Sequence, residues 1–227
     1  MRESFGTGLR KDGGMHPANL LTRLDRAVMP RCCAFCGVRC EQDERYVCSG
    51  CKRDLRYSDR CVEAAPPFGA VIAPMAYAFP VDAAIKALKF RRKLFYVPAF
   101  VELMIEATAH LPASADALLP VPLHWWRHVM RGFNQSDELC KSLRKATGLP
   151  VTRAVKRVRA TPSQTGLSAP QRKANLRGAF RLARKVRARH IVIVDDVITT
   201  GATARAVAQV LLDAGVDEVS LLVLARA

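Results

Sequence analysis

Residues Val192 to Thr203 read VIVDDVITTGAT, and this stretch decides the fold. The apolar run from Ile191 to Val194 predicts a buried parallel strand that ends on two adjacent carboxylates, Asp195 and Asp196. Small and hydroxyl-bearing residues follow, and apolar residues at helical spacing then predict a helix. The stretch therefore predicts a strand, an acidic turn, a small-residue loop and a helix start, in this order.

This order suits a ribose 5-phosphate. Free N–H groups at a helix start favour a phosphate, Gly201 lets the backbone approach it, and threonine hydroxyls donate to its oxygens. Carboxylates repel a phosphate, so Asp195 and Asp196 must serve a sugar diol or a bound Mg²⁺ instead. The alternative is an acidic strand end that caps an ordinary helix, which the following TTGAT disfavours.

The stretch resembles the binding signature for phosphoribosyl pyrophosphate (PRPP) in type I phosphoribosyltransferases. The resemblance implies that Asp195 and Asp196 hold the ribose diol. It also implies a cradle for the 5-phosphate, formed by Val197, Ile198, Thr199, Thr200, Gly201, Ala202 and Thr203.

Strands and helices alternate along the rest of the chain. Apolar patterns predict strands at 71–78, 117–121 and 219–224, and helices at 83–90, 98–111 and 134–147. Pro74 predicts an edge or a break in the first of these strands. The alternation predicts an α/β fold with a doubly wound parallel sheet, in which ligands bind at the carboxyl ends of the strands.

Two CxxC pairs, Cys33/Cys36 and Cys48/Cys51, have eleven residues between them. Two such knuckles can complete a tetrahedral site, and we favour structural zinc over disulfides because no secretory signal is evident. Cys32 and Cys40 are close enough in sequence to be alternative ligands. We expect Cys61 and Cys140, which have no obvious partner, to be core residues or free thiols.

The chain divides into three predicted parts. Residues 1–16 are expected to form a flexible tail, in which Met15 is an alternative start, and residues 17–65 a helix followed by the four-cysteine module. A proline-rich joint at 64–69 marks the boundary to a phosphoribosyltransferase-like domain at 66–227. No apolar run reaches the ~18 residues of a membrane helix, so we expect a cytoplasmic protein without membrane insertion.

The net charge of +16 is concentrated in one region. Residues 121–190 contain 17 lysines and arginines against two acidic residues. This basic block fits a substrate with several phosphates, and it equally fits a nucleic-acid backbone. The alternative is a solvated basic surface without a ligand.

The segment 118–135 supplies further candidates. Arg127 and Arg131 can meet a pyrophosphate, because arginine makes bidentate contacts to phosphate oxygens. We expect the adjacent Trp125 and Trp126 to pack rather than to form a stacking surface. His124 and His128 are candidates for a base by location only, and structural or solvent-facing histidines are the favoured alternative. A polar segment at 160–178 is expected to be a mobile loop that closes over a ligand.

Together with the paired CxxC module, four blocks resemble the ComF family of competence-associated proteins, and they occur in its order. The blocks are YAFPVDAAIKALKF, PVPLHWWRHVMRGFNQ, SQTGLSAPQRKANLRGAF and VIVDDVITTGAT. The resemblance implies a type I phosphoribosyltransferase-like parallel sheet flanked by helices, a small zinc-ribbon-like module and a role in DNA uptake.

Two functions are compatible with this resemblance. The first is a Mg²⁺-dependent transferase in which Arg131 and Arg127 stabilise departing pyrophosphate while a nitrogen nucleophile attacks C1 of PRPP. The second is a non-catalytic factor that senses PRPP, or that binds single-stranded DNA or proteins of the competence machinery. The intact signature favours the first function, and the charge of the basic block favours the second.

Overall fold

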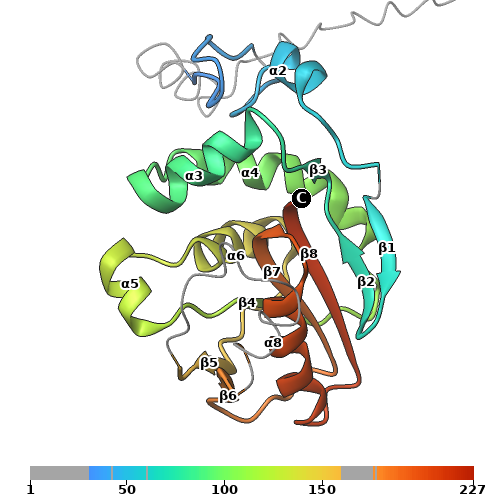
Figure 1. Ribbon diagram of the computed structural model, residues 1–227. Helices are drawn as coiled ribbons and strands as arrows, with labels where there is room; N and C mark the ends of the chain where they lie inside the picture. Colours follow the sequence, from blue (N-terminus) through green and yellow to red (C-terminus); the bar gives the residue numbers. More distant parts are fainter. Residues whose placement is uncertain (1–30, 42, 60, 160–175, 177) are drawn as a thin grey trace, which may run out of the picture.

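The computed structural model describes residues 31–41, 43–59, 61–159, 176 and 178–227. At its centre lies a six-stranded sheet in the order β1-β2-β8-β7-β4, with β3 also paired to β8 (Figure 1). Its strands are β1 (Val62–Ala65), β2 (Phe68–Ile72), β3 (Met75–Ala76), β4 (Ala117–Pro120), β7 (His190–Ile198) and β8 (Glu218–Arg226). Every pairing is parallel except that of β1 with β2, so the predicted parallel sheet is confirmed apart from this antiparallel edge.

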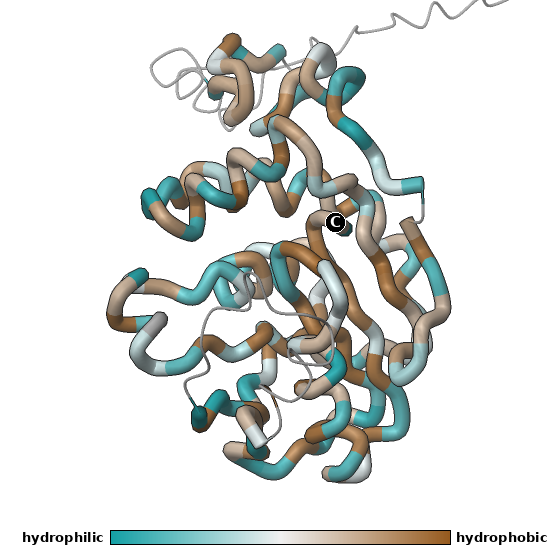
Figure 2. Tube along the Cα trace, viewed as in Figure 1, coloured by the Kyte–Doolittle hydropathy of each residue, from teal (hydrophilic) through white to brown (hydrophobic). Residues whose placement is uncertain are grey.

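Both faces of the sheet are covered. One face packs against α3 (Val81–Arg91), α4 (Tyr96–Ile105), the 3₁₀ turn η1 (Glu106–His110) and α6 (Gln135–Thr147). The other packs against α8 (Ala202–Leu212) and the antiparallel pair of β5 (Val155–Arg157) and β6 (Phe180–Leu182). Successive residues of β7 alternate between the two cores, and β7 and β8 carry long hydrophobic stretches in Figure 2. A strand buried on both sides needs such a continuous apolar sequence.

Most predicted elements are found close to their expected bounds. Pro74 separates β2 from β3, which confirms the predicted break. Asn134 caps the start of α6 and Gly148, with φ 75°, ends it, as the sequence indicates. The helix predicted at 98–111 is instead divided, because α4 continues as the 3₁₀ turn η1.

The predicted end of β7 is wrong. The strand continues through both aspartates to Ile198, because residues from Asp195 onward still pair with β8. The two carboxylates therefore belong to a strand and not to a turn.

The cysteine-containing segment, with α2 (Ser49–Asp54), packs on α4. Val47 and Leu55 are buried in the same core as the α4 residues. Glu102 of α4 accepts a hydrogen bond from the N–H of Tyr46 (2.8 Å), and its other oxygen lies 2.8 Å from Nζ of Lys52. These contacts attach the segment to the helical layer of the main fold.

The predicted tail at 1–16, the helix predicted at 17–29 and nearly all of the loop predicted at 160–178 lie outside the described residues. The predicted division at residues 65 and 66 stays a prediction. The strand just before it, β1, pairs with β2 across this position.

Candidate functional site

The acidic pair lies where β7, α6 and α3 meet. Asp195 Oδ1 accepts hydrogen bonds from Oγ of Ser136 (2.8 Å) and from the N–H of Asp196 (2.9 Å). Oδ2 of Asp196 lies 2.9 Å from Nζ of Lys89 on α3. The side chain of Asp196 is only 2% exposed, so this carboxylate is buried beside its counter-ion.

Burial, and then the negative charge of Asp196, raise the pKa of Asp195 to about 7, although Lys89 and the hydrogen bond from Ser136 act in the opposite direction. Near neutral pH the protonated and ionised forms of this carboxyl group are therefore both populated. A ligand that donates hydrogen bonds, or a cation, would favour its ionised form. The pair is thus suited to bind donors rather than anions.

This raised pKa predicts a pH-dependent effect of Asp195→Asn on stability. The folded protein binds the Asp195 proton more tightly than the unfolded chain, whose aspartates titrate at about 3.9. The resulting stabilisation is complete below that value and is lost as the pH rises through about 7. Asn stays neutral and still accepts both hydrogen bonds, so we expect Tm to rise by a few degrees at pH 8 and to change little at pH 4.5. Thermal scans at the two pH values check this, and equal shifts at both would contradict it.

The seven residues predicted to hold a phosphate surround one small hollow of about 50 Å³ beside Asp195. Gly201, with φ 71°, is the N-cap of α8 and has no side chain to occupy the amide groups of the first turn. A Cβ at this position would also lie 3.4 Å from Cδ1 of Ile198. This is an ordinary van der Waals distance, so the left-handed backbone explains the glycine, and the helix start offers N–H groups to an anion.

A second hollow of about 220 Å³ adjoins the first, and both are lined by Asp195, Val197, Thr199 and Thr203. It adds basic side chains from three elements, namely Lys89 of α3, Arg131 of α5 (Trp125–Arg131) and Arg157 of β5. Asp196 lines this second hollow as well. The structure thus brings Arg131 together with the acidic pair, in a cleft with a phosphate-sized end and a basic end.

Arg131 is oriented by its neighbours, since its Nη1 donates to Oε1 of Gln135 (3.3 Å) and its guanidinium lies 5.5 Å from the ring centre of Phe90. Arg127 also belongs to α5, but its side chain lies outside the described part of the structure. Nδ1 of His124 accepts a hydrogen bond from the N–H of Trp126 (3.3 Å) and so caps α5. His128 is exposed, so both histidines fit the structural alternative better than a base.

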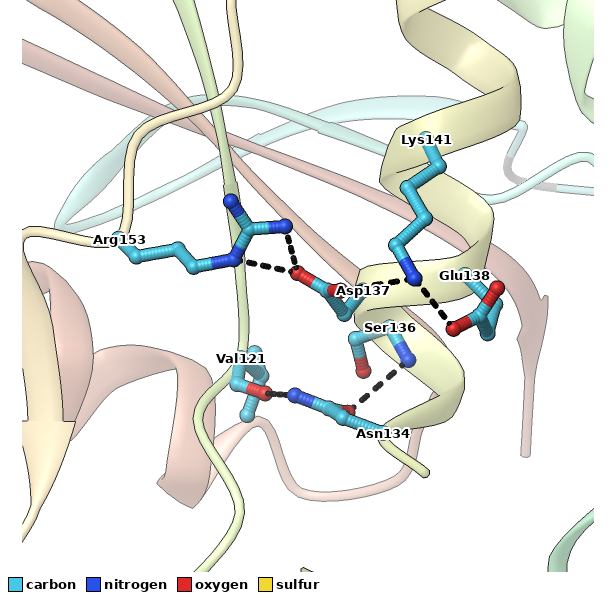
Figure 3. A network of polar contacts seen from close by, with 7 residues as sticks. All are labelled: Val121, Asn134, Ser136, Asp137, Glu138, Lys141 and Arg153. Atoms are coloured by element: carbon cyan, nitrogen blue, oxygen red, sulfur yellow. Dashed lines mark hydrogen bonds and ion pairs between the residues drawn. The ribbon is translucent and has the colours of Figure 1, made fainter. Parts of the chain in front are cut away.

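A polar network fixes the start of α6 and with it Ser136 (Figure 3). Nδ2 of Asn134 donates to the carbonyl oxygen of Val121 (3.0 Å), which directly follows β4. Oδ1 of Asn134 accepts from the N–H of Ser136 (3.1 Å). Asp137 lies 2.6 Å from Nη2 of Arg153. Figure 3 also shows Lys141 bound to Asp137 and Glu138. These contacts hold the hydroxyl that supports Asp195.

Sequence reasoning missed Ser136 and Arg157 as residues of the cleft. Ser136 lies 59 positions from Asp195 in the sequence, and no local pattern marks Ser136 or Arg157 as part of the cleft. The parallel pairing of β4 with β7 brings Ser136, on the helix that follows β4, close to Asp195 on β7.

The expectation that Trp125 and Trp126 pack rather than form a stacking surface is contradicted by their exposure. Their side chains are 63% and 55% exposed, because α5 projects from the edge of the molecule instead of covering the sheet (Figure 1). The two rings contact each other edge to face, with centres 5.6 Å apart.

The four predicted zinc ligands lie together. The sulfur atoms of Cys33, Cys36, Cys48 and Cys51 are all within 4.8 Å of one another, and those of Cys36 and Cys48 are 3.6 Å apart. Sulfur atoms of a tetrahedral zinc site are separated by about 3.8 Å. The cluster is therefore compatible with zinc.

The pKa values of the clustered thiols differ, since burial raises that of Cys51 whereas that of Cys33 is lowered. Burial raises the pKa of the Cys33 thiol, but backbone hydrogen bonds from Cys48, Cys36 and Phe35 outweigh it and lower the pKa to about 7. A low pKa favours the thiolate that zinc requires. By contrast, burial raises the pKa of Cys40, which lies outside the cluster, to about 11. Cys140 is fully buried in the core, as expected.

Comparison with known proteins agrees with this architecture. A model of the phosphoribosyl transferase domain matches residues 130–227. The DNA utilization protein YhgH of Escherichia coli (strain K12) is 38% identical over 204 residues, which cover 86% of this chain and 89% of that protein. The chain belongs to the ComF family. A second relative, competence protein F of Haemophilus influenzae, is 33% identical over 79% of this chain and 84% of its own length.

Weaker matches are found among solved structures of phosphoribosyltransferases. The ComF-family chain matches adenine phosphoribosyltransferase with a TM-score of 0.33 and 18% identity, over 59% of this chain and 68% of that enzyme. It matches the glutamine PRPP amidotransferase of B. subtilis with a TM-score of 0.38 and 23% identity, over 56% of this chain but only 26% of that enzyme. The matched domain and the mostly parallel sheet flanked by helices make the fold type I phosphoribosyltransferase-like, with a cysteine cluster near the N-terminus. Among its described residues, no helix has the length and apolar character needed to cross a bilayer.

Proposed function

We propose that this ComF-family chain binds PRPP in the cleft beside β7. The observation that carries the proposal is that Asp195 borders both hollows. One is lined by residues 197–203, and the other by Lys89, Arg131 and Arg157. Along its ribose ring, PRPP carries a phosphate on C5, the diol on C3 and C2, and a pyrophosphate on C1. Each chemical group of the ligand would therefore meet a complementary part of the cleft.

The reaction that fits this site is phosphoribosyl transfer to a nitrogen acceptor. The nitrogen would form a bond to C1, the bond from C1 to pyrophosphate would break, and pyrophosphate would leave with the electron pair. Asp195 and Asp196 would hold the diol, while Arg131 and Arg127 would stabilise the charge on the leaving group. Catalysis would rest on orientation and electrostatics.

Mg²⁺ fits the same place, because it prefers oxygen ligands and Asp195 and Asp196 offer adjacent carboxylates. Among described residues, Oδ2 of Asp196 receives no hydrogen bond of acceptable geometry, although Lys89 is its ion-pair partner. When bound with PRPP, the ion would supply positive charge to the departing pyrophosphate. We further propose that the cysteine cluster holds a structural zinc ion and that the protein acts in the cytoplasm.

Calorimetric titration with PRPP and Mg²⁺ tests the binding step. Assays for pyrophosphate release over a panel of purine and pyrimidine bases and amines test turnover. We expect micromolar binding of PRPP, and release with one class of acceptor. Binding without release for any acceptor would instead support the PRPP-sensing alternative, and an absence of binding would contradict the proposal.

A second candidate function is the binding of single-stranded DNA, favoured by the exposed surface where α3 ends beside α5. Nη2 of Arg92 donates to the carbonyl oxygen of Met130 (3.0 Å), which joins the two helices. The aromatic-basic surface, as we name it, consists of the exposed side chains of Phe90, Arg91, Arg92, Lys93, Trp125 and Trp126. Aromatic rings with neighbouring basic groups stack bases and contact phosphates of single strands without sequence preference.

Trp125→Ala combined with Trp126→Ala is expected to weaken binding of an oligothymidine about ten- to a hundredfold, because stacking contributes about 1–3 kcal/mol per base. The dependence on salt should remain steep, since the basic residues are retained. Fluorescence anisotropy over a range of salt concentrations measures both effects. Phe79→Ala removes a ring that is 80% exposed at the other end of α3 and serves as the control. Equal losses for both variants would contradict a specific stacking surface.

A further inference from the structure

Lys89 covers the carboxylate that a ribose diol would have to reach. Its Nζ lies 2.9 Å from Oδ2 of Asp196, and Lys89 and Asp196 side chains are 19% and 2% exposed. Oδ2 itself is inaccessible to solvent and, among described residues, lacks a hydrogen bond of acceptable geometry. The diol can therefore use this oxygen only after the ammonium group has moved.

Moving the ammonium group away has an electrostatic consequence. It would leave Asp196 as a buried charge without its counter-ion, and a neutral diol compensates such a charge poorly. Lys89 in turn needs another anionic partner close to its original position. The second hollow, which Lys89 lines together with Arg131 and Arg157, is where an anionic group on C1 of the ribose would lie.

The neighbouring lysine of the same helix shows that this arrangement is particular to Lys89. Lys86 lies almost one turn earlier on α3 and pairs with Asp82 (2.6 Å), and its side chain is 56% exposed. It does not line either hollow. The two lysines thus have the same charge and the same helix but different surroundings.

We propose that Lys89 determines ligand selectivity by exchanging partners: it leaves Asp196 only when the incoming ribose 5-phosphate also carries an anionic group at C1. The site then selects PRPP over ribose 5-phosphate, because only PRPP both occupies Asp196 and provides a new partner for the ammonium group. This inference rests on the proposed binding of PRPP. It makes Lys89 a specificity-determining residue.

The test is calorimetric titration of the full chain, with Mg²⁺ present, with PRPP and separately with ribose 5-phosphate. We expect the wild-type protein to bind PRPP at least a hundredfold more tightly than ribose 5-phosphate. Lys89→Met should weaken PRPP binding at least tenfold and leave the affinity for ribose 5-phosphate unchanged or higher, so that the ratio of the two affinities falls at least tenfold. Lys89→Arg should retain most of the ratio, and Lys86→Met, the matched control, should retain all of it.

If Lys89→Met weakens the binding of PRPP and of ribose 5-phosphate equally, the inference is overturned, because the loss of a purely structural lysine would affect the binding of both. If Lys89→Met does not fold, Lys89→Gln removes the charge while it keeps a hydrogen-bond donor, and the same fall in the ratio is expected. PRPP binding with an unchanged ratio would overturn the selectivity role alone. An absence of PRPP binding by the wild-type protein would overturn the proposed function as well.

Discussion

Replacing Asp195 and Asp196 together by Asn is expected to abolish the rise in Tm that PRPP and Mg²⁺ produce. A ligand at a hundred times its Kd stabilises a protein by about 2.7 kcal/mol. For a chain of this size, each kcal/mol corresponds to about 2–4 °C, so the wild-type protein should gain about 5–10 °C. The variant keeps the shape of the cleft but offers neutral amides to the diol and to the metal ion. Differential scanning fluorimetry with and without ligand measures the difference.

A matched control is available in the same protein. Asp213→Asn with Asp217→Asn makes the same change in net charge at two exposed positions between α8 and β8. This control should keep the full shift. Because Asp196→Asn also removes the counter-ion of Lys89, the unliganded variant is scanned as well, and a cooperative transition shows that it is folded. A full shift in the Asp195 and Asp196 variant would contradict their role in ribose binding.

Replacing Cys48 by Ser is expected to remove zinc and to lower Tm strongly. Structural zinc sites contribute about 10–16 kcal/mol of apparent binding free energy in small zinc-dependent folds, and the bound metal is part of the folding free energy. In this protein the cysteine segment also buries Val47 and Leu55 against the α4 layer. Loss of the zinc ion should therefore lower the Tm of the whole protein and not only unfold the cysteine segment. Metal analysis by mass spectrometry, with thermal scans, measures both effects.

Cys40→Ser is the control for this experiment. Cys40 is near the cluster in sequence, but its thiol lies outside the group of four sulfur atoms. The control should retain about one zinc per chain and nearly the wild-type Tm. A Cys48→Ser protein that keeps its zinc, or a folded wild-type protein that purifies without metal, would contradict the assignment.

The elements that could be predicted from sequence are those with strong local signals. The run Ile191 to Val194 forms a doubly buried strand, and Asn134 and Gly148 bound α6 as expected, because capping depends on neighbouring residues only. The segment from Thr199 to Thr203 also carries a local pattern, since glycine and small residues there predict the loop and the helix start that the structure has. The paired CxxC knuckles belong to the same class of local signal.

What could not be predicted depends on contacts between distant segments. Ser136 supports Asp195 only because β4 and β7 are neighbours, and Lys89 reaches Asp196 only because α3 lies over the same face of the sheet. The end of β7 was misjudged because acidic residues suggest a strand end, whereas pairing with β8 extends the strand. The size of Trp125 and Trp126 favours packing, but α5 stands away from the core and leaves both side chains exposed.

The position of the acidic pair on β7, between β4 and β8, has a consequence for how this protein can change over time. The carboxylates are anchored in the interior, where substitutions are poorly tolerated because packing is dense. The basic groups opposite them come from α3, α5 and β5, which lie around the rim of the cleft. Substitutions in these outer elements can therefore change the charge of the cleft while the two carboxylates and the strand that holds them stay intact.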